Sequence, residues 1–421
     1  MTLPNRPRGT QDIYFPRSLI YQKIQQIIAE ILRQNNYQPI IFPTFEAKEL
    51  FTTSLGFTTD IIHKEMYIFA DRKGRQLALR PEGTASVVRL VCQNKLIKES
   101  YPLKLCYWAN MFRYERPQQG RYREFWQMGV ELINAEGIIA DYQILKLTAD
   151  IFRGLGIKGF SFRLNYLGNN ETKESYKKKL KGFIKKTAPD LCADCQRRNK
   201  TNPLRILDCS LCKNKYRYPS YKDAWSEKDN NYINELNGIL DKFNLPYQYD
   251  YHLVRGLDYY TGLVFEIDLG TEKAILGGGR YDNLYQEIGG VDVPAIGFAI
   301  GIERLADYLE EKKILKTEQA VDIFFLVMVA EAYPDILFWK KALEKYFADQ
   351  KYSLTADYNL EVKALKFLPK IIDYYQPKIL IIVGERELKS GKIAIKDCQK
   401  RQNFSVEKEK LIEWISDYFL P

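Results

Sequence analysis

The spacing of apolar residues near the start of the chain predicts a helix followed by a short strand. Between residues 17 and 35, apolar side chains recur every three or four positions, which is typical of an amphipathic helix: Ile20, Ile24, Ile27, Ile28, Ile31 and Leu32. Residues 39–43, PIIFP, then predict a strand. Prolines lack an amide donor, so this strand belongs at a sheet edge or an interface. The pair fits either ordinary core packing or a dimer seam.

Alternating apolar and polar positions predict a β-hairpin over residues 107–131. Its middle, residues 116–121, is polar, basic and turn-forming. The same alternation predicts further strands over residues 66–70, 76–80, 160–164, 263–269 and 295–300. Helices are predicted from about residue 84 to 96 and over residues 140–155.

The pattern resets from Val321 onward. Strand-like segments (322–329, 353–357, 378–384 and 391–397) alternate with helical ones (338–347, 362–375 and 407–419). This alternation predicts a separate α/β domain with a mostly parallel or mixed sheet. Its boundary is predicted at residues 310–318, which are charged and poor in large apolar residues.

Composition predicts a folded, cytoplasmic protein of several domains. The chain has 421 residues, of which 46% are hydrophobic and 14% aromatic. At about 150 residues per domain, two to four domains are expected. No window approaches the roughly 18 apolar residues of a membrane span. The first residues, MTLPNRPRGTQD, lack the apolar run of a signal peptide.

The net charge of +10 favours a polyanionic partner, although a generally basic surface would give the same value. The charge is concentrated, because residues 171–230 hold 16 Lys and Arg against 8 Asp and Glu. One basic insertion could therefore account for most of the excess.

Four of the seven cysteines form two C-x2-C pairs, Cys192 with Cys195 and Cys209 with Cys212, separated by 13 residues. In a cytoplasmic chain a disulfide framework is not expected. This spacing predicts a tetrahedral thiolate site for a structural zinc ion, with unliganded thiols as the alternative. Cys92, Cys106 and Cys398 stand in apolar stretches and are expected to be packing residues.

Arginines along the predicted hairpin indicate a phosphate site. Arg113, Arg121 and Arg123 lie among Trp, Tyr and Phe. Arginine offers a planar fork of donors to phosphate oxygens, and an aromatic ring can stack on a base. The alternative is a hairpin whose ion pairs face solvent.

Four further segments carry candidate chemistry. Glu82 and Thr84 lie at a strand-to-helix junction, where they could bind a ligand or where Thr84 could cap the helix. Residues 252–262, HLVRGLDYYTG, favour a site, with His252 in a structural role. The glycines of GGGRYD, residues 277–282, fit neither a dinucleotide fingerprint nor a P-loop, and suggest a close approach of backbone to ligand. Arg304 near a helix start would face a phosphate.

These motifs together resemble those of the bacterial histidyl-tRNA synthetases, which are class II aminoacyl-tRNA synthetases. The likeness covers nearly the whole chain. It rests on LRPEGTA (79–85), FRYERPQQGRYREFWQMGVE (112–131), LVRGLDYYTGLVFE (253–266), GGGRYD (277–282), GFAIGIERL (297–305) and VGERELKSGKIAIKD (383–397). LVRGLDYY with GGRYD is particular to the histidine enzyme rather than to its class.

The resemblance implies an α+β fold. It comprises an antiparallel catalytic sheet in two parts (residues 1–168 and 249–316), a basic insertion with the candidate zinc site (169–248), and a C-terminal α/β anticodon-binding domain (320–421). It also implies a homodimer, with its seam at the first helix and the proline-bounded strand. Paired cysteines are not universal in the family, so zinc rests on their spacing alone.

The implied reaction joins histidine to the ATP α-phosphate and then passes the histidyl group to the 3′ end of tRNA(His), with Mg²⁺ accompanying ATP. Arg113 would hold the α-phosphate and the carboxylate, and Arg255 would replace a catalytic metal ion. Arg121 and Arg304 would hold the distal phosphates. Since two anions must meet, cations are needed to stabilise the transition state.

The implied histidine-binding residues are Glu82, Gly83, Thr84, Arg113, Gln127, Glu131, Arg255, Tyr259 and Tyr260. Among them, Glu131 and Tyr260 would bind the imidazole, whose two nitrogens both need partners. Gln118 would meet the acceptor end of tRNA. The basic insertion would contact the acceptor arm through phosphates, which give affinity but little sequence information.

Two other classes of protein share parts of this pattern. One is the synthetase-like regulatory subunit of ATP phosphoribosyltransferase, which generally lacks the C-terminal domain and loses catalytic residues. The other is a nonenzymatic zinc-containing RNA-binding protein, which would leave the arginines unexplained. Histidine-dependent exchange of ATP with pyrophosphate would separate all three.

Overall fold

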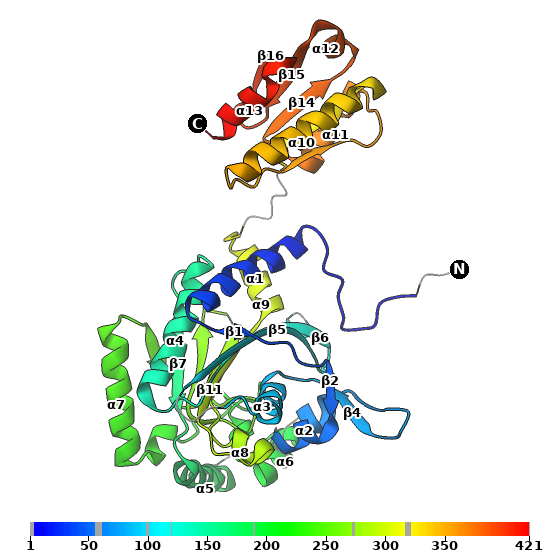
Figure 1. Ribbon diagram of the computed structural model, residues 1–421. Helices are drawn as coiled ribbons and strands as arrows, with labels where there is room; N and C mark the ends of the chain where they lie inside the picture. Colours follow the sequence, from blue (N-terminus) through cyan, green and yellow to red (C-terminus); the bar gives the residue numbers. More distant parts are fainter. Residues whose placement is uncertain are drawn as a thin grey trace. The chain divides into compact units, whose positions relative to one another are not determined.

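The computed structural model describes residues 4–54, 61–97, 101–118, 120–187, 190–271, 274–315 and 321–420. The chain divides into two compact units, residues 1–316 and 317–421 (Figure 1). The predicted boundary at residues 310–318 lies partly outside the described residues. Helix α9 (Ile302–Glu311) is the last regular element of the first unit, and it ends inside this predicted boundary.

The first unit is built on an eight-stranded sheet in the order β1-β5-β6-β11-β10-β9-β7-β8. Its central strands are antiparallel, and the outermost pairs, β1 with β5 and β7 with β8, are parallel. The strands are β1 (Gln38–Pro39), β5 (Leu103–Phe112), β6 (Glu124–Ile133), β7 (Ser161–Tyr166), β8 (Tyr247–Tyr249), β9 (Thr261–Asp268), β10 (Leu276–Arg280) and β11 (Ala295–Gly301). The predicted hairpin is confirmed as the β5–β6 pair.

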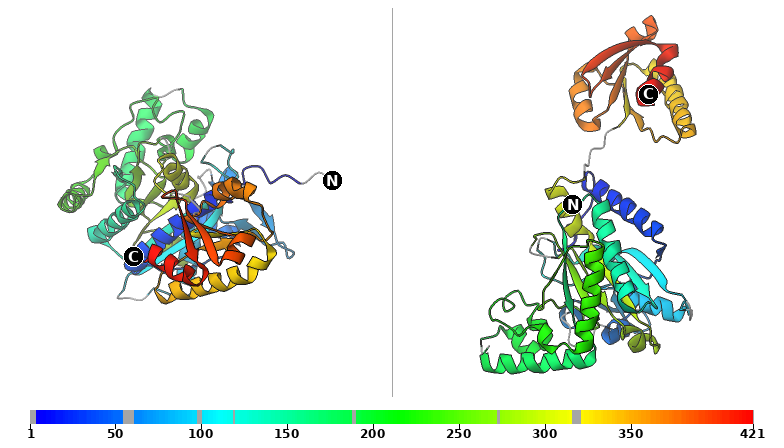
Figure 2. Two further views of the ribbon diagram at one scale, coloured as in Figure 1. Left: turned by 90° about the horizontal axis from the view of Figure 1, so that it is seen from above. Right: turned by 90° about the vertical axis from the view of Figure 1, so that its left-hand side faces the viewer.

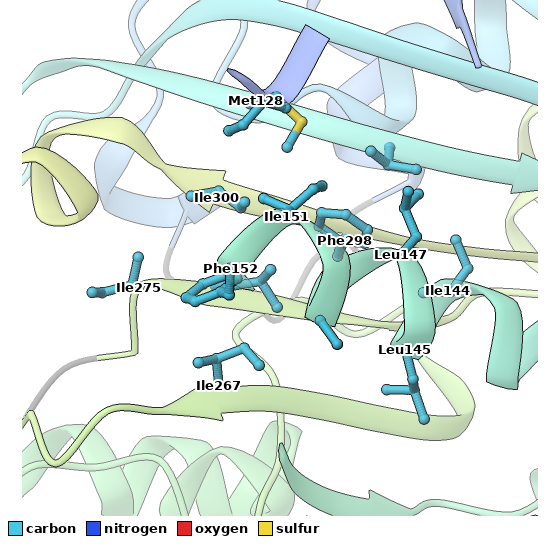
Figure 3. Packing of buried hydrophobic residues seen from close by; sticks show 14 of the residues in the cluster. Met128, Ile144, Leu145, Leu147, Ile151, Phe152, Ile267, Ile275, Phe298 and Ile300 are labelled. Atoms are coloured by element: carbon cyan, nitrogen blue, oxygen red, sulfur yellow. The ribbon is translucent and has the colours of Figure 1, made fainter. Parts of the chain in front are cut away.

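Both faces of this sheet are buried, because neighbouring residues of β5 enter different cores. Leu105 and Tyr107 join one cluster with helices α3 (Thr84–Gln93) and α8 (Leu284–Gly289), whereas Cys106 joins the other. The second cluster packs α1 (Arg17–Gln34), α4 (Gly137–Gly154) and α9 on the sheet. Figure 3 shows Leu147 and Ile151 of α4 close to Phe298 and Ile300 of β11. The predicted helix over residues 17–35 is confirmed as α1.

The predicted strand over residues 39–43 is wrong beyond Pro39. The carbonyl groups of Phe42 and Pro43 accept hydrogen bonds from Nη1 of Arg80, at 2.8 and 3.0 Å, rather than from a neighbouring strand. Only β1 joins the sheet, at its edge as expected. A small three-stranded sheet follows, ordered β2-β4-β3, with β2 (Phe45–Ala47), β3 (Ile68–Ala70), β4 (Gln76–Leu79) and the short helix α2 (Lys48–Ser54) beside it.

Residues 169–248 form a mostly helical insertion between strands β7 and β9. It contains α5 (Asn170–Thr187), α6 (Ala193–Thr201), α7 (Glu227–Lys242) and the short 3-10 helices Pro203–Ile206 and Tyr221–Ala224. Its last strand, β8, returns to pair with β7 at the edge of the large sheet. The insertion is therefore anchored to the sheet at both ends.

The second unit, whose ribbon is drawn from two further sides in Figure 2, has a mixed sheet, as predicted. It has five strands in the order β13-β12-β14-β15-β16. The strands β12 (Ile323–Val327), β13 (Ala356–Tyr358) and β14 (Ile379–Val383) are parallel, and β15 (Lys392–Asp397) and β16 (Gln402–Glu407) are antiparallel to their neighbours. Helices α10 (Tyr333–Asp349) and α13 (Leu411–Phe419) pack on one face and α11 (Leu368–Tyr375) on the other. Strand β16 and helix α12 (Glu385–Ser390) were not predicted.

A membrane-spanning helix would need a length and apolar character that none of the helices in the described ranges combines.

Candidate active site

One cleft of about 910 Å³ in the first unit brings together most of the predicted site residues. Its walls come from the start of α3, the β5–β6 hairpin, the loop before β9, strands β10 and β11, and the start of α9. The predicted residues that line it are Glu82, Thr84, Arg113, Arg121, Gln127, Glu131, Arg255, Tyr259, Tyr260 and Arg304. Residues from five separate parts of the chain therefore face one space.

The four predicted arginines all line this cleft. Arg113 is fixed by a 2.8 Å hydrogen bond from Nε to the Pro81 carbonyl, and its guanidinium lies 5.3 Å from the ring centre of Phe125. Arg304 donates from Nε to the Gly120 carbonyl at 3.0 Å and from Nη1 to the Ala274 carbonyl at 2.7 Å. Burial and then the neighbouring charge of Arg121 lower the pKa of Arg304. The cations are thus close enough to repel one another, which favours binding of a polyanion.

Arg255 is held across the sheet by an ion pair with Glu266 of β9. Burial lowers the pKa of Arg255, but Glu266, Tyr260 and Asp208 raise it, and the net shift is upward. Gly277 of β10 makes this position available, because a Cβ there would lie 1.8 Å from Nη2 of Arg255. This glycine was predicted to let the backbone approach a ligand closely. It instead leaves room for the guanidinium of Arg255, which lines the cleft.

Glu131 lies buried at the base of the cleft. It accepts a hydrogen bond from Oγ1 of Thr84 at 2.9 Å and another from the Tyr281 hydroxyl at 2.5 Å. Burial raises the pKa of Glu131 to about 8. A carboxyl group in this state can exchange a proton or a hydrogen bond with a polar ring that enters the site.

Of the two roles considered for Thr84, ligand binding or helix capping, the structure does not show the capping, because Glu82 accepts the capping hydrogen bonds instead. Its carboxylate accepts hydrogen bonds from the backbone N–H groups of Thr84 at 2.7 Å and Ala85 at 2.8 Å. Burial raises the pKa of Glu82, and these two amides partly offset that shift. Thr84 is free to bind Glu131 with its hydroxyl instead.

Gln127 offers a ligand contact, because its buried Oε1 has no hydrogen-bond partner among the described residues. Tyr259 and Tyr260 are buried side by side, with ring centres 4.8 Å apart. Gly83 does not line the cleft but packs beneath the Tyr107 ring, where a Cβ would lie 2.4 Å from the hydroxyl. Gln118 is exposed in the hairpin turn, where its backbone pairs with that of Arg121.

The four paired cysteines form a compact cluster in the insertion. Their sulfur atoms all lie within 4.8 Å of one another, and those of Cys192 and Cys209 are 3.8 Å apart. Four thiolates about 2.3 Å from a zinc ion lie about 3.8 Å from each other, so the cluster fits that ion. Of the remaining cysteines, Cys106 is buried, and Cys92 and Cys398 are half-buried.

Several residues of the cleft were not predicted. Glu266 alternates with the buried Phe265 and Ile267 in β9, so its direction was readable but its partner Arg255 was not, whereas Tyr107 is itself a buried residue of the core. Tyr281 belongs to a recognised motif without an assigned role. Leu207, Asp208 and Ser210 come from the cysteine-containing segment and form another wall. No local pattern shows that an insertion reaches a distant cleft.

Comparison with known proteins agrees with this site. The family model described as histidyl-tRNA synthetase matches residues 9–170 and 210–305. The histidine–tRNA ligase of Mycoplasma capricolum is 40% identical over 400 residues, covering 93% of this chain and 95% of that protein. The ligase of Bacillus subtilis is 37% identical over 421 residues, with 97% of each chain covered.

A solved structure has the same fold over almost the whole length. The apo histidyl-tRNA synthetase of S. aureus superposes with a TM-score of 0.78 at 31% identity, covering 98% of this chain and 100% of the other. Sequence, fold and the arrangement of arginines around one cleft lead to the same assignment. The chain belongs to the histidyl-tRNA synthetase family.

Proposed function

We propose that this protein is an ATP-dependent histidine–tRNA ligase. It activates L-histidine with ATP to histidyl-adenylate, releases pyrophosphate, and transfers the histidyl group to the 3′ end of tRNA(His). The observation that carries the proposal is the convergence of Arg113, Arg121, Arg255 and Arg304 on one cleft. Two anionic reactants need such a set of fixed cations when they meet.

The four arginines act on different parts of the reactants. Arg121 and Arg304 hold the distal phosphates, while Arg113 binds the α-phosphate and the histidine carboxylate. Arg255, on the loop before β9, stabilises the charge that develops during attack. ATP arrives with Mg²⁺, whose charge offsets that of the phosphates.

The polar residues at the base of the cleft select histidine. Glu131 and Tyr260 bind the imidazole, whereas Glu82, Thr84 and Gln127 surround the α-amino group. Gly83 and Tyr259 shape this pocket through packing. Because a ligand without ring nitrogens would leave buried polar groups unpaired, the pocket rejects apolar amino acids strongly.

Exchange of labelled pyrophosphate into ATP tests this assignment without tRNA. Exchange should require histidine and fail with glutamine or phenylalanine. Arg255→Ala should abolish exchange because the developing charge loses its cation, while thermal unfolding stays cooperative. Arg72→Ala, at an exposed position of the turn between β3 and β4, is the control. Near-normal exchange by Arg255→Ala would contradict the role proposed for Arg255. Absence of exchange in the wild type would contradict the proposed function.

We further propose that tRNA contacts Gln118, the basic insertion and the second unit, and that the enzyme works in the cytoplasm as a homodimer. Ile41 and Phe45, which follow β1, are 96% and 51% exposed, so they present an apolar surface suited to a second copy. Light scattering should give twice the chain mass. A monomer at micromolar concentration would contradict the dimer.

We also propose a structural zinc ion at Cys192, Cys195, Cys209 and Cys212. Four thiolates fill a tetrahedral site and leave no position for a catalytic water. Metal analysis of the full-length protein should give about one zinc per chain. Thiol titration should find four more reactive cysteines after chelation than before it.

A further inference from the structure

We propose that the cysteine-containing segment holds the Arg255 loop in its active position through Arg205, and that bound metal maintains this arrangement. Arg205 is then a positioning residue for the adenylation step. The inference rests on the proposed function, and it adds a link between the thiolate site and the catalytic cation.

The segment between the two cysteine pairs contacts the loop directly. Nη1 of Arg205 donates a hydrogen bond to the backbone carbonyl of Arg255 at 2.9 Å. Nδ2 of Asn202 donates to Oδ1 of Asp258 at 2.8 Å. The loop that carries Arg255 is therefore bound at two positions by residues that lie close together in the insertion.

The second cysteine pair is connected to the start of the same loop. The Tyr218 hydroxyl donates to the Cys212 carbonyl at 3.0 Å, and the Tyr218 carbonyl accepts a hydrogen bond from Nε2 of His252 at 3.1 Å. From helix α5, Nζ of Lys173 donates to the Tyr260 carbonyl at 2.8 Å. Residues 252–260 are thus held by the insertion along their length, in agreement with the structural role predicted for His252.

The contacts of Arg205 indicate that it positions the Arg255 backbone as well as filling space. It is 8% exposed, and Nη1 also lies 3.2 Å from Oδ2 of Asp208. A Cβ on Gly256 would be 3.6 Å from this nitrogen. Since a buried guanidinium is costly to place without partners, its direction towards the Arg255 carbonyl fixes that peptide.

The thiolate cluster controls the position of Arg205 because the two are adjacent along the chain. Arg205 lies four residues before Cys209 in the sequence. The backbone N–H of Cys209 donates a hydrogen bond to the Ile206 carbonyl at 3.2 Å. A metal ion bound by all four sulfurs fixes this turn. Without the ion, four neighbouring thiols offer only weak hydrogen bonds to hold it.

Displacement of the loop should affect the chemical step more than binding. Arg255 stabilises charge that develops in the transition state, whereas Arg113, Arg121 and Arg304 hold ATP from other elements. A shift of the Arg255 peptide by about 1 Å can reduce the rate about 100-fold. The expected signature is therefore a lower kcat with KM values for ATP and histidine close to those of the wild type.

Full-length variants test the link by histidine-dependent pyrophosphate exchange together with zinc analysis. Arg205→Ala should keep its zinc and lose about 10- to 100-fold in kcat. Arg205→Lys should recover part of this loss, since Nζ can donate to the same carbonyl. Cys209→Ser should lose both zinc and kcat, and Arg72→Ala should match the wild type. If Arg205→Ala does not fold, Arg205→Lys and metal removal decide the question.

Zinc removal from the wild type with a zinc-selective chelator should lower kcat, and added zinc should restore it. Wild-type kcat in folded Arg205→Ala, or in the zinc-free protein, would overturn the inference while leaving the proposed function intact. A purified wild type that binds no zinc would also overturn it. A wild type with zinc but without exchange would instead overturn the proposed function, and this inference with it.

Discussion

Glu131 illustrates how a single residue in the cleft is tuned by its surroundings. Two hydroxyl groups, from Thr84 and Tyr281, point at its carboxyl oxygens, yet burial outweighs them and raises its pKa to about 8. At neutral pH the ligand-free protein therefore keeps this carboxyl mostly protonated. Sequence alone could name Glu131 as a ligand residue, but its protonation state depends on burial that only the folded sheet creates.

The folding stability of the protein should reflect this ionisation. An unfolded glutamate has a pKa of about 4.3, so the raised folded value means that Glu131 opposes folding increasingly between pH 4 and pH 8. Glu131→Gln cannot ionise, so it should gain stability relative to the wild type as pH rises through this window. The ceiling is about 1.4 kcal/mol per pH unit.

Urea unfolding at pH 5.5, 7 and 8.5 measures the effect. Glu311→Gln, at the exposed end of α9, controls for the type of substitution. A difference between Glu131→Gln and the wild type that stays constant over this range would contradict the assigned environment.

At the scale of elements, the sequence predicted the hairpin, most strands, helices such as α1, α4 and α10, and the mixed sheet of the second unit, because each carries its own periodicity, but it missed the helices of the insertion. It failed where a distant side chain replaces a local partner. Arg80 satisfies the carbonyls of Phe42 and Pro43, so the strand predicted there does not extend. Glu82, two residues before the start of α3, accepts hydrogen bonds from the first backbone N–H groups of this helix. Thr84 is therefore not needed as a cap. The residues of the insertion that line the cleft follow no periodic pattern in the sequence, so their position at the cleft was not predicted.

Strand β10 provides a test at this scale, because its glycines create space for side chains from β9 and its preceding loop. Gly277→Ala places a methyl group 1.8 Å from Nη2 of Arg255. The guanidinium is the flexible end of a side chain and can move, so we expect the fold to survive. Pyrophosphate exchange should fall by about 100-fold because the cation is displaced.

The matched control is Gly182→Ala in helix α5, where an added methyl group meets no atom within 4 Å. It should leave exchange unchanged and slightly increase helix stability. Normal exchange in Gly277→Ala would show that Arg255 does not need its observed position.

At the scale of the whole molecule, each of the two units has its own hydrophobic core. In the second unit, Phe325 and Val327 of β12 pack with Trp339 and Leu343 of α10. The four arginines that line the cleft all belong to residues 1–316. Activation of histidine and recognition of tRNA should therefore be separable.

A chain that ends at residue 316 should keep histidine-dependent exchange within a few-fold of the full-length protein. Charging of tRNA should fall at least about tenfold in kcat/KM, because the contacts proposed between the second unit and the polyanion would be lost. The isolated residues 317–421 should unfold cooperatively on heating. A folded 1–316 fragment without exchange would contradict this division of work.

The crowding of cations around the cleft has a consequence for the life of the protein in a cell. Burial and then the neighbouring charge of Arg121 lower the pKa of Arg304, and a bound polyphosphate would offset the repulsion between the two cations. A ligand that binds only the folded state protects it from unfolding by mass action. When energy supply fails and nucleotide falls, translation would thus lose not only a substrate but also some of the synthetase itself, to heat and to proteases.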